Sequence, residues 1–195
     1  NGADLWGCVL PDDTIVHQAY GSASAGDPFR AWVLRSEDGG ETWEMVTMAY
    51  DGGVHPFNET SLLYLPEGRI IAMVRTPSGS KSIPEEERYL WQTHSDDGGK
   101  TWSSPVEVLE GTHCSVVQLG DGVLLCGYHR PPQLALSTDG GKTWYEKMLW
   151  EIEKPKSNWG WYSSVEVVDD NTAIALIKQF PAHNIIRACL LHRQP

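Results

Sequence analysis

Short segments of alternating or continuous apolar residues follow one another along the whole chain, and turns rich in Gly, Pro and Asp separate them. Segments of four to eight residues with a period of two are typical of β-strands, whereas helical periodicity is weak throughout. The pattern therefore predicts an all-β protein with strands over residues 5–10, 14–20, 29–35, 44–48, 61–65, 69–74, 89–93, 106–109, 114–119, 123–128, 133–136, 145–149, 162–168, 172–178 and 185–192.

An eight-residue motif, S-x-D-G-G-x-T-W, occurs three times, at residues 36–43, 95–102 and 137–144. We interpret it as a structural hairpin turn, called an Asp-box. The carboxylate accepts bonds from turn amides, Gly supplies positive φ, Thr re-enters the strand, and Trp folds back as an apolar plug. A calcium loop is disfavoured because it needs more oxygen ligands at fixed positions. The structural residues are Asp38, Trp43, Asp97, Trp102, Asp139 and Trp144.

The predicted strands group into units at residues 3–50, 57–110, 112–150 and 160–193, of which the last lacks an Asp-box and a clear outer strand. Four-stranded units at intervals of about 40 to 50 residues are typical of propeller blades. We therefore predict a single β-propeller domain or fragment with about four antiparallel blades. Four blades can close by themselves or form part of a larger ring.

The charge balance argues against several partners. The 195 residues carry a formal net charge of −11, and the 15 Lys and Arg residues form no basic stripe. Nucleic acid and anionic membrane surfaces are therefore not expected as partners. No apolar stretch is long enough to span a bilayer and no signal peptide is visible. Because the chain does not begin with Met, we expect its native N-terminus to lie elsewhere, and the compartment is left unassigned.

The cysteines and histidines indicate no metal centre. Cys8, Cys114, Cys126 and Cys189 lack zinc-ligand spacing, and no two of the seven histidines are spaced as a ligand pair. We expect no metal and no cofactor, and we interpret all four cysteines as buried small apolar residues. A disulfide between Cys114 and Cys126, which flank a predicted hairpin turn but lie diagonally across it, is the alternative.

Outside the Asp-boxes the sequence resembles the sialidase (neuraminidase) superfamily over nearly its whole length. Residues 58–75, N-E-T-S-L-L-Y-L-P-E-G-R-I-I-A-M-V-R, are similar to a segment of these six-bladed enzymes. The resemblance implies that Glu59 activates the nucleophile and that Arg75 belongs to a triad of arginines that binds the substrate carboxylate. Arg130, which precedes the third Asp-box at a spacing one residue shorter than in the family, would be another triad member.

Residues 160–165, G-W-Y-S-S-V, resemble the strand start in which sialidases carry their tyrosine nucleophile, which would be Tyr162. A neutral tyrosine suits a substrate with a carboxylate on its anomeric carbon, because a carboxylate nucleophile would be repelled there. Its phenol, with a pKa of about 10, needs a base such as Glu59 during attack. Trp159 and Trp161 are candidates for sugar stacking, although such tryptophans more often pack within a blade.

The sequence departs from the family in two respects. Lys178 stands where sialidases have a glutamate that supports the first triad arginine, and no counterpart of that arginine or of the aspartate general acid is present. The chain thus resembles the later four blades of a six-bladed domain. We expect a missing N-terminal segment or self-association to complete the ring.

Three functions remain open. The first is a retaining exo-glycosidase acting on terminal sialic acid or a related acidic sugar, in which Tyr162, Glu59, Arg75 and Arg130 converge. The second is a non-catalytic propeller that binds glycan or protein on the same frame. The third is a hydrolase of neutral polysaccharide, which would use paired carboxylates instead of arginines.

Overall fold

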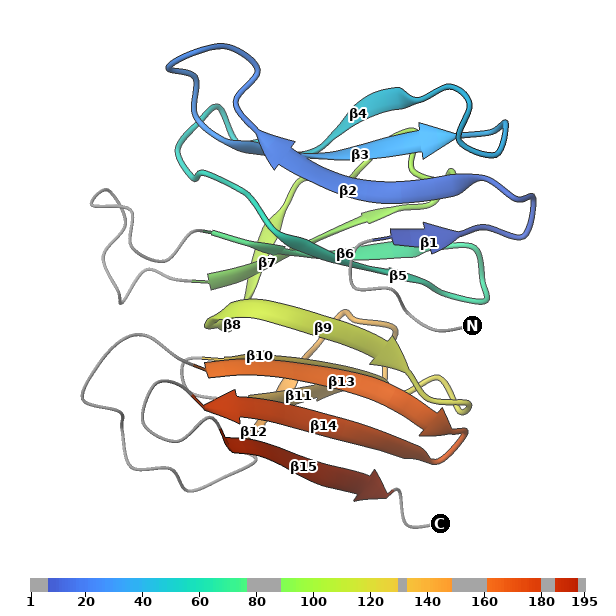
Figure 1. The fold of residues 1–195 in the computed structure, drawn as a ribbon, viewed down its shortest axis with the longest axis vertical. Coiled ribbons are helices and arrows are strands. Elements are labelled where there is room, and N and C mark those ends of the chain that lie inside the picture. The colour runs from blue at the N-terminus through green and yellow to red at the C-terminus, as the bar shows by residue number, and fades with distance from the viewer. Residues whose placement is uncertain (1–6, 77–88, 130–132, 149–160, 180–184, 193–195) are drawn as a thin grey trace. The chain divides into compact units, whose positions relative to one another are not determined.

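The computed structural model describes residues 7–76, 89–129, 133–148, 161–179 and 185–192, and in these ranges the chain forms fifteen strands and no helix (Figure 1). The described residues therefore contain no helix that could cross a membrane. The chain divides into two compact units, which we call the N-terminal unit (residues 3–112) and the C-terminal unit (residues 113–195 with residues 1–2).

The N-terminal unit contains two four-stranded sheets whose strands follow one another in chain order. The first sheet consists of β1 (Gly7–Val9), β2 (Ile15–Gly21), β3 (Arg30–Ser36) and β4 (Glu44–Ala49). The second consists of β5 (Thr60–Tyr64), β6 (Ile70–Arg75), β7 (Tyr89–Ser95) and β8 (Val106–Glu110). Neighbouring strands are antiparallel, as short connections require.

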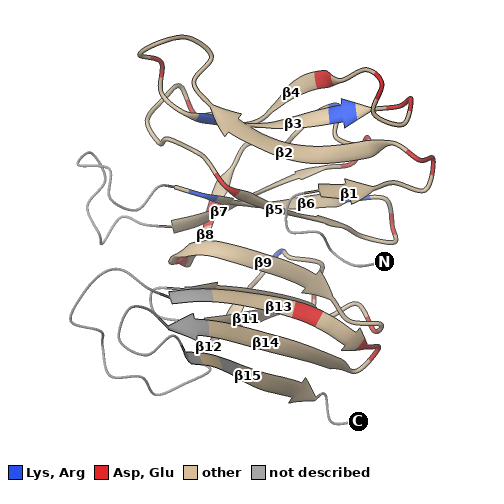
Figure 2. Ribbon diagram, in the orientation of Figure 1, with Lys and Arg blue, Asp and Glu red and all other residues tan. Residues whose placement is uncertain are grey.

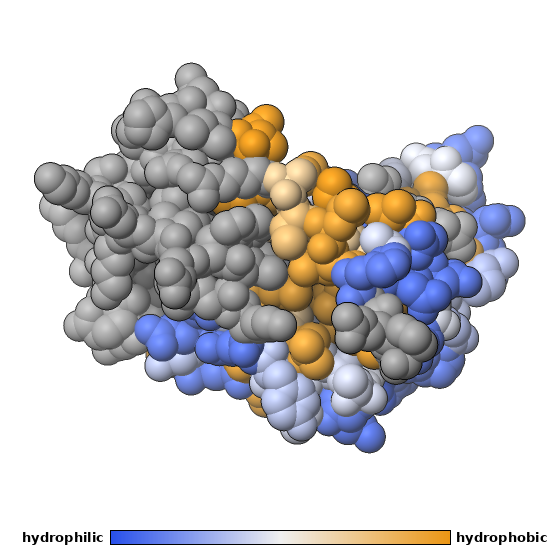
Figure 3. Space-filling model, turned by 90° about the horizontal axis from the view of Figure 1, so that it is seen from below, coloured by the Kyte–Doolittle hydropathy of each residue, from blue (hydrophilic) through white to orange (hydrophobic). Residues whose placement is uncertain are grey.

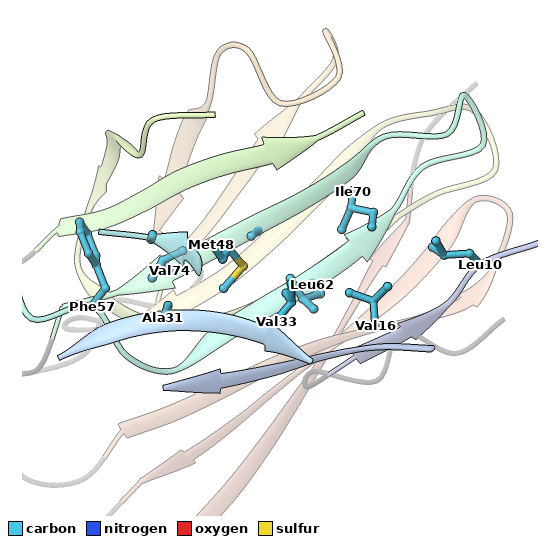
Figure 4. Close-up of a cluster of buried hydrophobic side chains, with 11 residues drawn as sticks. Leu10, Val16, Ala31, Val33, Met48, Phe57, Leu62, Ile70 and Val74 are labelled. Atoms are coloured by element: carbon cyan, nitrogen blue, oxygen red, sulfur yellow. The ribbon is translucent and has the colours of Figure 1, made fainter. Parts of the chain in front are cut away.

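One hydrophobic core joins these two sheets (Figure 4). Because side chains alternate across a strand, every second residue of β5 and β6 points to the same face, and apolar residues occupy these positions. The core contains Leu10, Val16, Ala31, Val33, Met48, Ala49, Phe57, Leu62, Ile70, Ala72 and Val74. Its burial stabilises the face-to-face packing of the two sheets.

The C-terminal unit contains a four-stranded and a three-stranded sheet. The first is formed by β9 (Thr112–Gln118), β10 (Leu124–His129), β11 (Gln133–Ser137) and β12 (Tyr145–Met148), and the second by β13 (Trp161–Asp169), β14 (Thr172–Gln179) and β15 (Ile185–His192). The two sheets approach closely at Gly127, where an added Cβ atom would lie 2.4 Å from Cγ2 of Val165. The amide of Val165 also donates a hydrogen bond to the buried Ser115 hydroxyl.

The predicted strand pattern is confirmed in every described segment, including the shorter fourth unit with three strands. The described residues therefore form an all-β structure of four antiparallel sheets. The arrangement of these sheets as a propeller remains a prediction. Apolar side chains gather on one face of the surface (Figure 3), and Leu176, Ile186 and Leu190 of β14 and β15 are 36, 66 and 67% exposed. Such exposed apolar residues on a sheet commonly mark a surface that packs against other protein.

The three Asp-boxes form the same hydrogen-bonded turn. In each, the aspartate accepts bonds from the amide and the hydroxyl of the threonine four residues later, and the preceding serine hydroxyl donates to the same carboxylate. Two expectations are wrong for the first of these turns, whereas Trp102 of the second turn packs against the hydrophobic core. Thr42 is held by Asp38 and β4 begins only at Glu44, and Trp43 is 47% exposed instead of forming an apolar plug.

These hydrogen bonds lower the pKa of the three aspartates to about 2. For Asp38 and Asp139 the leading cause is the bond from the threonine hydroxyl. For Asp97 burial acts in the opposite direction, and the bonds from Thr101 outweigh it. Each carboxylate is therefore charged and fully engaged in its turn, which fits the predicted structural role.

All four cysteines are free thiols, so the alternative of a disulfide between Cys114 and Cys126 is not formed. Cys114 and Cys126 are buried as predicted, and burial together with contact from Cys114 raises the pKa of Cys126. The prediction of burial is wrong for Cys8 and Cys189, which are partly exposed. Burial nevertheless raises the pKa of Cys8 to about 11, so this thiol stays protonated at neutral pH.

Candidate functional site

Glu59 and Arg75 form an ion pair where β5 begins and β6 ends (Figure 2). The strand register brings them together, because Thr60 pairs with Val74 and the amide of Arg75 donates to the carbonyl of Glu59 at 3.0 Å. The amide of Asn58 donates to the carbonyl of Arg75 at 2.9 Å, which extends the ladder by one residue. The two predicted residues are therefore neighbours on one face of the sheet.

The ion pair is largely withdrawn from solvent. The side chain of Arg75 is 18% exposed and that of Glu59 is 26% exposed. The contact holds a guanidinium and a carboxylate together at one sheet end.

The loop that leads into this pair carries a histidine–aspartate contact that sequence analysis missed. The ring Nδ1 of His55 lies 2.5 Å from Oδ2 of Asp51, and the His55 amide donates to Oδ1 at 3.1 Å. The ring packs on Trp91 with centroids 4.7 Å apart, and Trp91 meets the buried Phe57 edge-on. Burial raises the pKa of Asp51, but the bonds from His55 outweigh it and lower the pKa overall.

A sequence signal for this contact did exist. Asp51 and His55 are four residues apart and enclose Gly52 and Gly53, both of which adopt positive φ. Two consecutive glycines after an aspartate favour a tight turn that brings the aspartate back onto a later amide.

Further aromatic residues flank the loop. The guanidinium of Arg30 lies 4.0 Å from the centre of the Tyr50 ring, and Tyr20 and Phe29 form a tilted, half-exposed pair. The loop also packs against its neighbour in space, because a Cβ atom on Gly53 would come within 2.4 Å of Cγ of Pro28. Residues 28–30 and 50–53 are therefore in contact at this end of the N-terminal unit.

The other predicted site residues lie in the C-terminal unit. Tyr162 is the second residue of β13, and its Cα pairs with that of Lys178, so the lysine that departs from the sialidase pattern is its direct cross-strand neighbour. Trp161 begins the same strand, whereas Arg130 and Trp159 lie outside the described residues. The convergence of Tyr162 and Arg130 with Glu59 and Arg75 stays a prediction.

No candidate metal centre occurs in the part of the chain that the structure describes, since it holds no group of three His, Cys, Asp or Glu side chains able to bind an ion.

Comparison with known proteins gives a family and a fold. The model of a BNR repeat-like domain matches residues 7–173. No curated protein matches the sequence. Among solved structures, a protein of unknown function from Dyadobacter fermentans superimposes with a TM-score of 0.73 at 19% identity, covering 96% of this chain and 52% of that one.

Two sialidases are also similar in structure. The Hadza microbial sialidase Hz136 gives a TM-score of 0.70 at 17% identity, covering 95% of this chain and 43% of its own. The Trypanosoma rangeli sialidase, solved as a covalent intermediate with 2,3-difluorosialic acid, gives 0.60 at 16% identity, covering 94% and 30%. The chain therefore spans about half the length of these structures or less, and at such identity the likeness concerns the fold.

Proposed function

We propose that this chain, which belongs to the BNR repeat-like domain family, is a sialidase-like retaining exo-glycosidase acting on terminal sialic acid or a related acidic sugar. The observation that carries the proposal is the ion pair of Glu59 with Arg75 at a sheet end. In this role Glu59 takes the proton of the Tyr162 phenol while the phenol oxygen bonds to the anomeric carbon and the glycosidic bond to the leaving-group oxygen breaks. The general acid gives that oxygen its proton, so the aglycone leaves as an alcohol. Arg75 and Arg130 bind the substrate carboxylate through paired, charge-assisted hydrogen bonds.

We further propose that the sheets are blades of a propeller that additional polypeptide completes. The chain spans only 43% of the Hz136 sialidase, and the exposed Leu176, Ile186 and Leu190 offer an apolar sheet face for packing. The general acid and the first arginine of the triad would come from that additional polypeptide, either a preceding segment or a second chain.

The proposal is tested by trapping the nucleophile. In 2,3-difluorosialic acid the leaving group is fluoride, which departs without a proton, so the reaction does not need the missing general acid. We expect mass spectrometry to find one sugar adduct, on the peptide containing Tyr162, and none in the Tyr162→Phe variant. Absence of the adduct from the unmodified chain, or an adduct on another residue, would contradict the proposal for this chain.

A non-catalytic glycan-binding protein is the second candidate, and the pairing of Lys178 with Tyr162 favours it. The sequence has Lys178 where the sialidase pattern has a glutamate. This candidate predicts sialoside binding in the absence of any adduct, which equilibrium titration of the same sample with sialyllactose would detect.

A further inference from the structure

A strip of five residues lies at the same end of the sheets of the N-terminal unit as the Glu59–Arg75 pair and has no part in the proposed bond cleavage. It consists of Arg30, Tyr50, Asp51, His55 and Trp91, and we call it the Arg30 strip. Its members touch in order: Arg30 lies on Tyr50, Asp51 follows Tyr50 in the chain and binds His55, and His55 packs on Trp91.

Arg30 differs from the other arginines whose side chains are described. Arg35, Arg69 and Arg75 each pair with a carboxylate, whereas Arg30 has neither an ion pair nor a hydrogen bond among the described residues, and its Nε is buried without a partner. In a protein with a net charge of −11, acidic partners are abundant. A guanidinium that is held instead by an aromatic ring keeps its planar fork available for an anionic group.

The imidazole of His55 can also form a hydrogen bond to a ligand. Asp51 engages Nδ1 and the backbone amide, which fixes both the ring orientation and the tautomer with hydrogen on Nδ1. Nε2 is then the remaining nitrogen, and it makes no hydrogen bond to any residue in the described ranges. The ring is held on Trp91 yet its side chain is 28% exposed, so a hydroxyl group can reach Nε2.

The surroundings indicate a sugar. Tyr20 near the end of β2 and Phe29 on the loop that follows present two half-exposed aromatic rings, and this loop contacts Gly53 through Pro28. Aromatic rings next to an arginine and a hydrogen-bonding imidazole can contact the apolar face, the anionic group and the hydroxyls of an acidic pyranose.

We propose that the Arg30 strip is a binding subsite for an acidic oligosaccharide, in which Arg30 binds the anionic group and Nε2 of His55 binds a ring hydroxyl. The proposal deepens the proposed function, because it rests on a glycan as the ligand of this sheet end. It does not require catalysis, since none of these residues takes part in the Tyr162 chemistry.

The test titrates the unmodified chain with sialyllactose, with a galacturonic acid trisaccharide and with neutral lactose. We expect both acidic sugars to bind roughly tenfold or more tightly than lactose, because a charge-assisted fork is lost with the neutral sugar. Arg30→Gln should lower the affinity for the acidic sugars by roughly tenfold. Arg30→Lys keeps the charge but not the planar fork, so its affinity should lie between those of Arg30→Gln and the unmodified chain.

His55→Phe keeps the aromatic contact with Trp91 and should weaken binding of the acidic sugars by roughly fivefold to tenfold. In the unmodified chain, the ¹⁵N resonance of Nε2 should shift when sugar is added, which a purely structural histidine would not show. The matched controls are Arg69→Gln and His17→Phe, which change the same residue types away from the strip and should leave affinity unchanged.

The outcomes separate the two proposals. Binding that depends on Arg30, without an adduct on Tyr162, supports the subsite and contradicts the glycosidase. An adduct without any effect of Arg30→Gln or His55→Phe supports the glycosidase and overturns the subsite. Equal affinity for lactose and the acidic sugars, or no binding of any of the three by the unmodified chain, also overturns the subsite.

Discussion

The two ends of the sheets in the N-terminal unit differ in how their polar side chains are hydrogen-bonded. Figure 2 colours the charged residues on these sheets. At one end, the Asp-boxes at 36–43 and 95–102 repeat the same bonds, and Arg35 ties them together by donating to the carbonyl of Gly98 at 2.7 Å. At the other end, the loops share no sequence, and Arg30 and His55 retain polar atoms that no described residue uses. At the first end the polar groups hydrogen-bond to one another. At the second end, polar atoms of Arg30 and His55 are left to bind the ligand of the proposed subsite.

The largest expected effect is on the rate of Tyr162 labelling when a carboxylate is removed from one end or the other. Glu59→Gln removes the base but keeps a side chain that can bond Arg75, so the rate at which 2,3-difluorosialic acid labels Tyr162 should fall by roughly 10² to 10⁴. Glu44→Gln, which changes a carboxylate of similar size at the Asp-box end, should label at the normal rate. Equal rates in all three proteins would show that Glu59 is not the base.

The next effect tests how the loop end is anchored. Phe57 is fully buried between Trp91 and the core, so Phe57→Ala should lower the free energy of unfolding by about 4 kcal/mol through lost burial and the resulting cavity. Val54→Ala, in the same loop but 72% exposed, should change it by less than about 0.5 kcal/mol. Urea unfolding measures both, and similar losses would mean that the loop is not anchored through Phe57.

A smaller effect is expected at the Asp-box end. Asp97→Ala removes the acceptor of the Thr101 amide and hydroxyl bonds, which resembles the loss of a capping residue and should cost about 1 to 2 kcal/mol. Lys100→Ala, at an exposed position of the same turn, should cost less than about 0.5 kcal/mol. A loss below the Lys100→Ala value would show that water replaces these bonds without penalty.

The fold was largely predictable because its signals are local. Alternating apolar residues and glycine turns place the strands, and every described strand overlaps its predicted range. The detail of the Asp-box was less predictable, since the exposure of Trp43 depends on which residues of the neighbouring strands reach its ring. Its indole nitrogen donates to the carbonyl of Gly40 at 3.0 Å, a contact that a tryptophan can make without being buried.

The candidate site was only partly predictable. Glu59 and Arg75 are brought together by the register of a hairpin whose turn, Pro66-Glu67-Gly68, is visible in the sequence. Arg30 was missed because its contact with Tyr50 depends on how two unrelated loops pack, which no repeat or period encodes. His55 was missed although its partner Asp51 lies four residues earlier in the same glycine-containing turn. Nothing in the spacing of Arg30 and Tyr50, for example, indicates that one lies over the other.

The smallest effect concerns pH and again distinguishes the ends. The pKa of Asp38 is lowered to about 2, first by the bond from the Thr42 hydroxyl, whereas an unfolded aspartate has a pKa of about 3.9. A lowered folded-state pKa stabilises the protein above the unfolded value, and this contribution is lost as the pH falls from about 4 towards 2. The stability difference between the unmodified chain and Asp38→Asn should therefore be constant from pH 7 to about 5 and then close on acidification. Urea unfolding at successive pH values measures it, and a difference that stays constant down to about pH 2.5 would show that the carboxylate charge does not hold the turn.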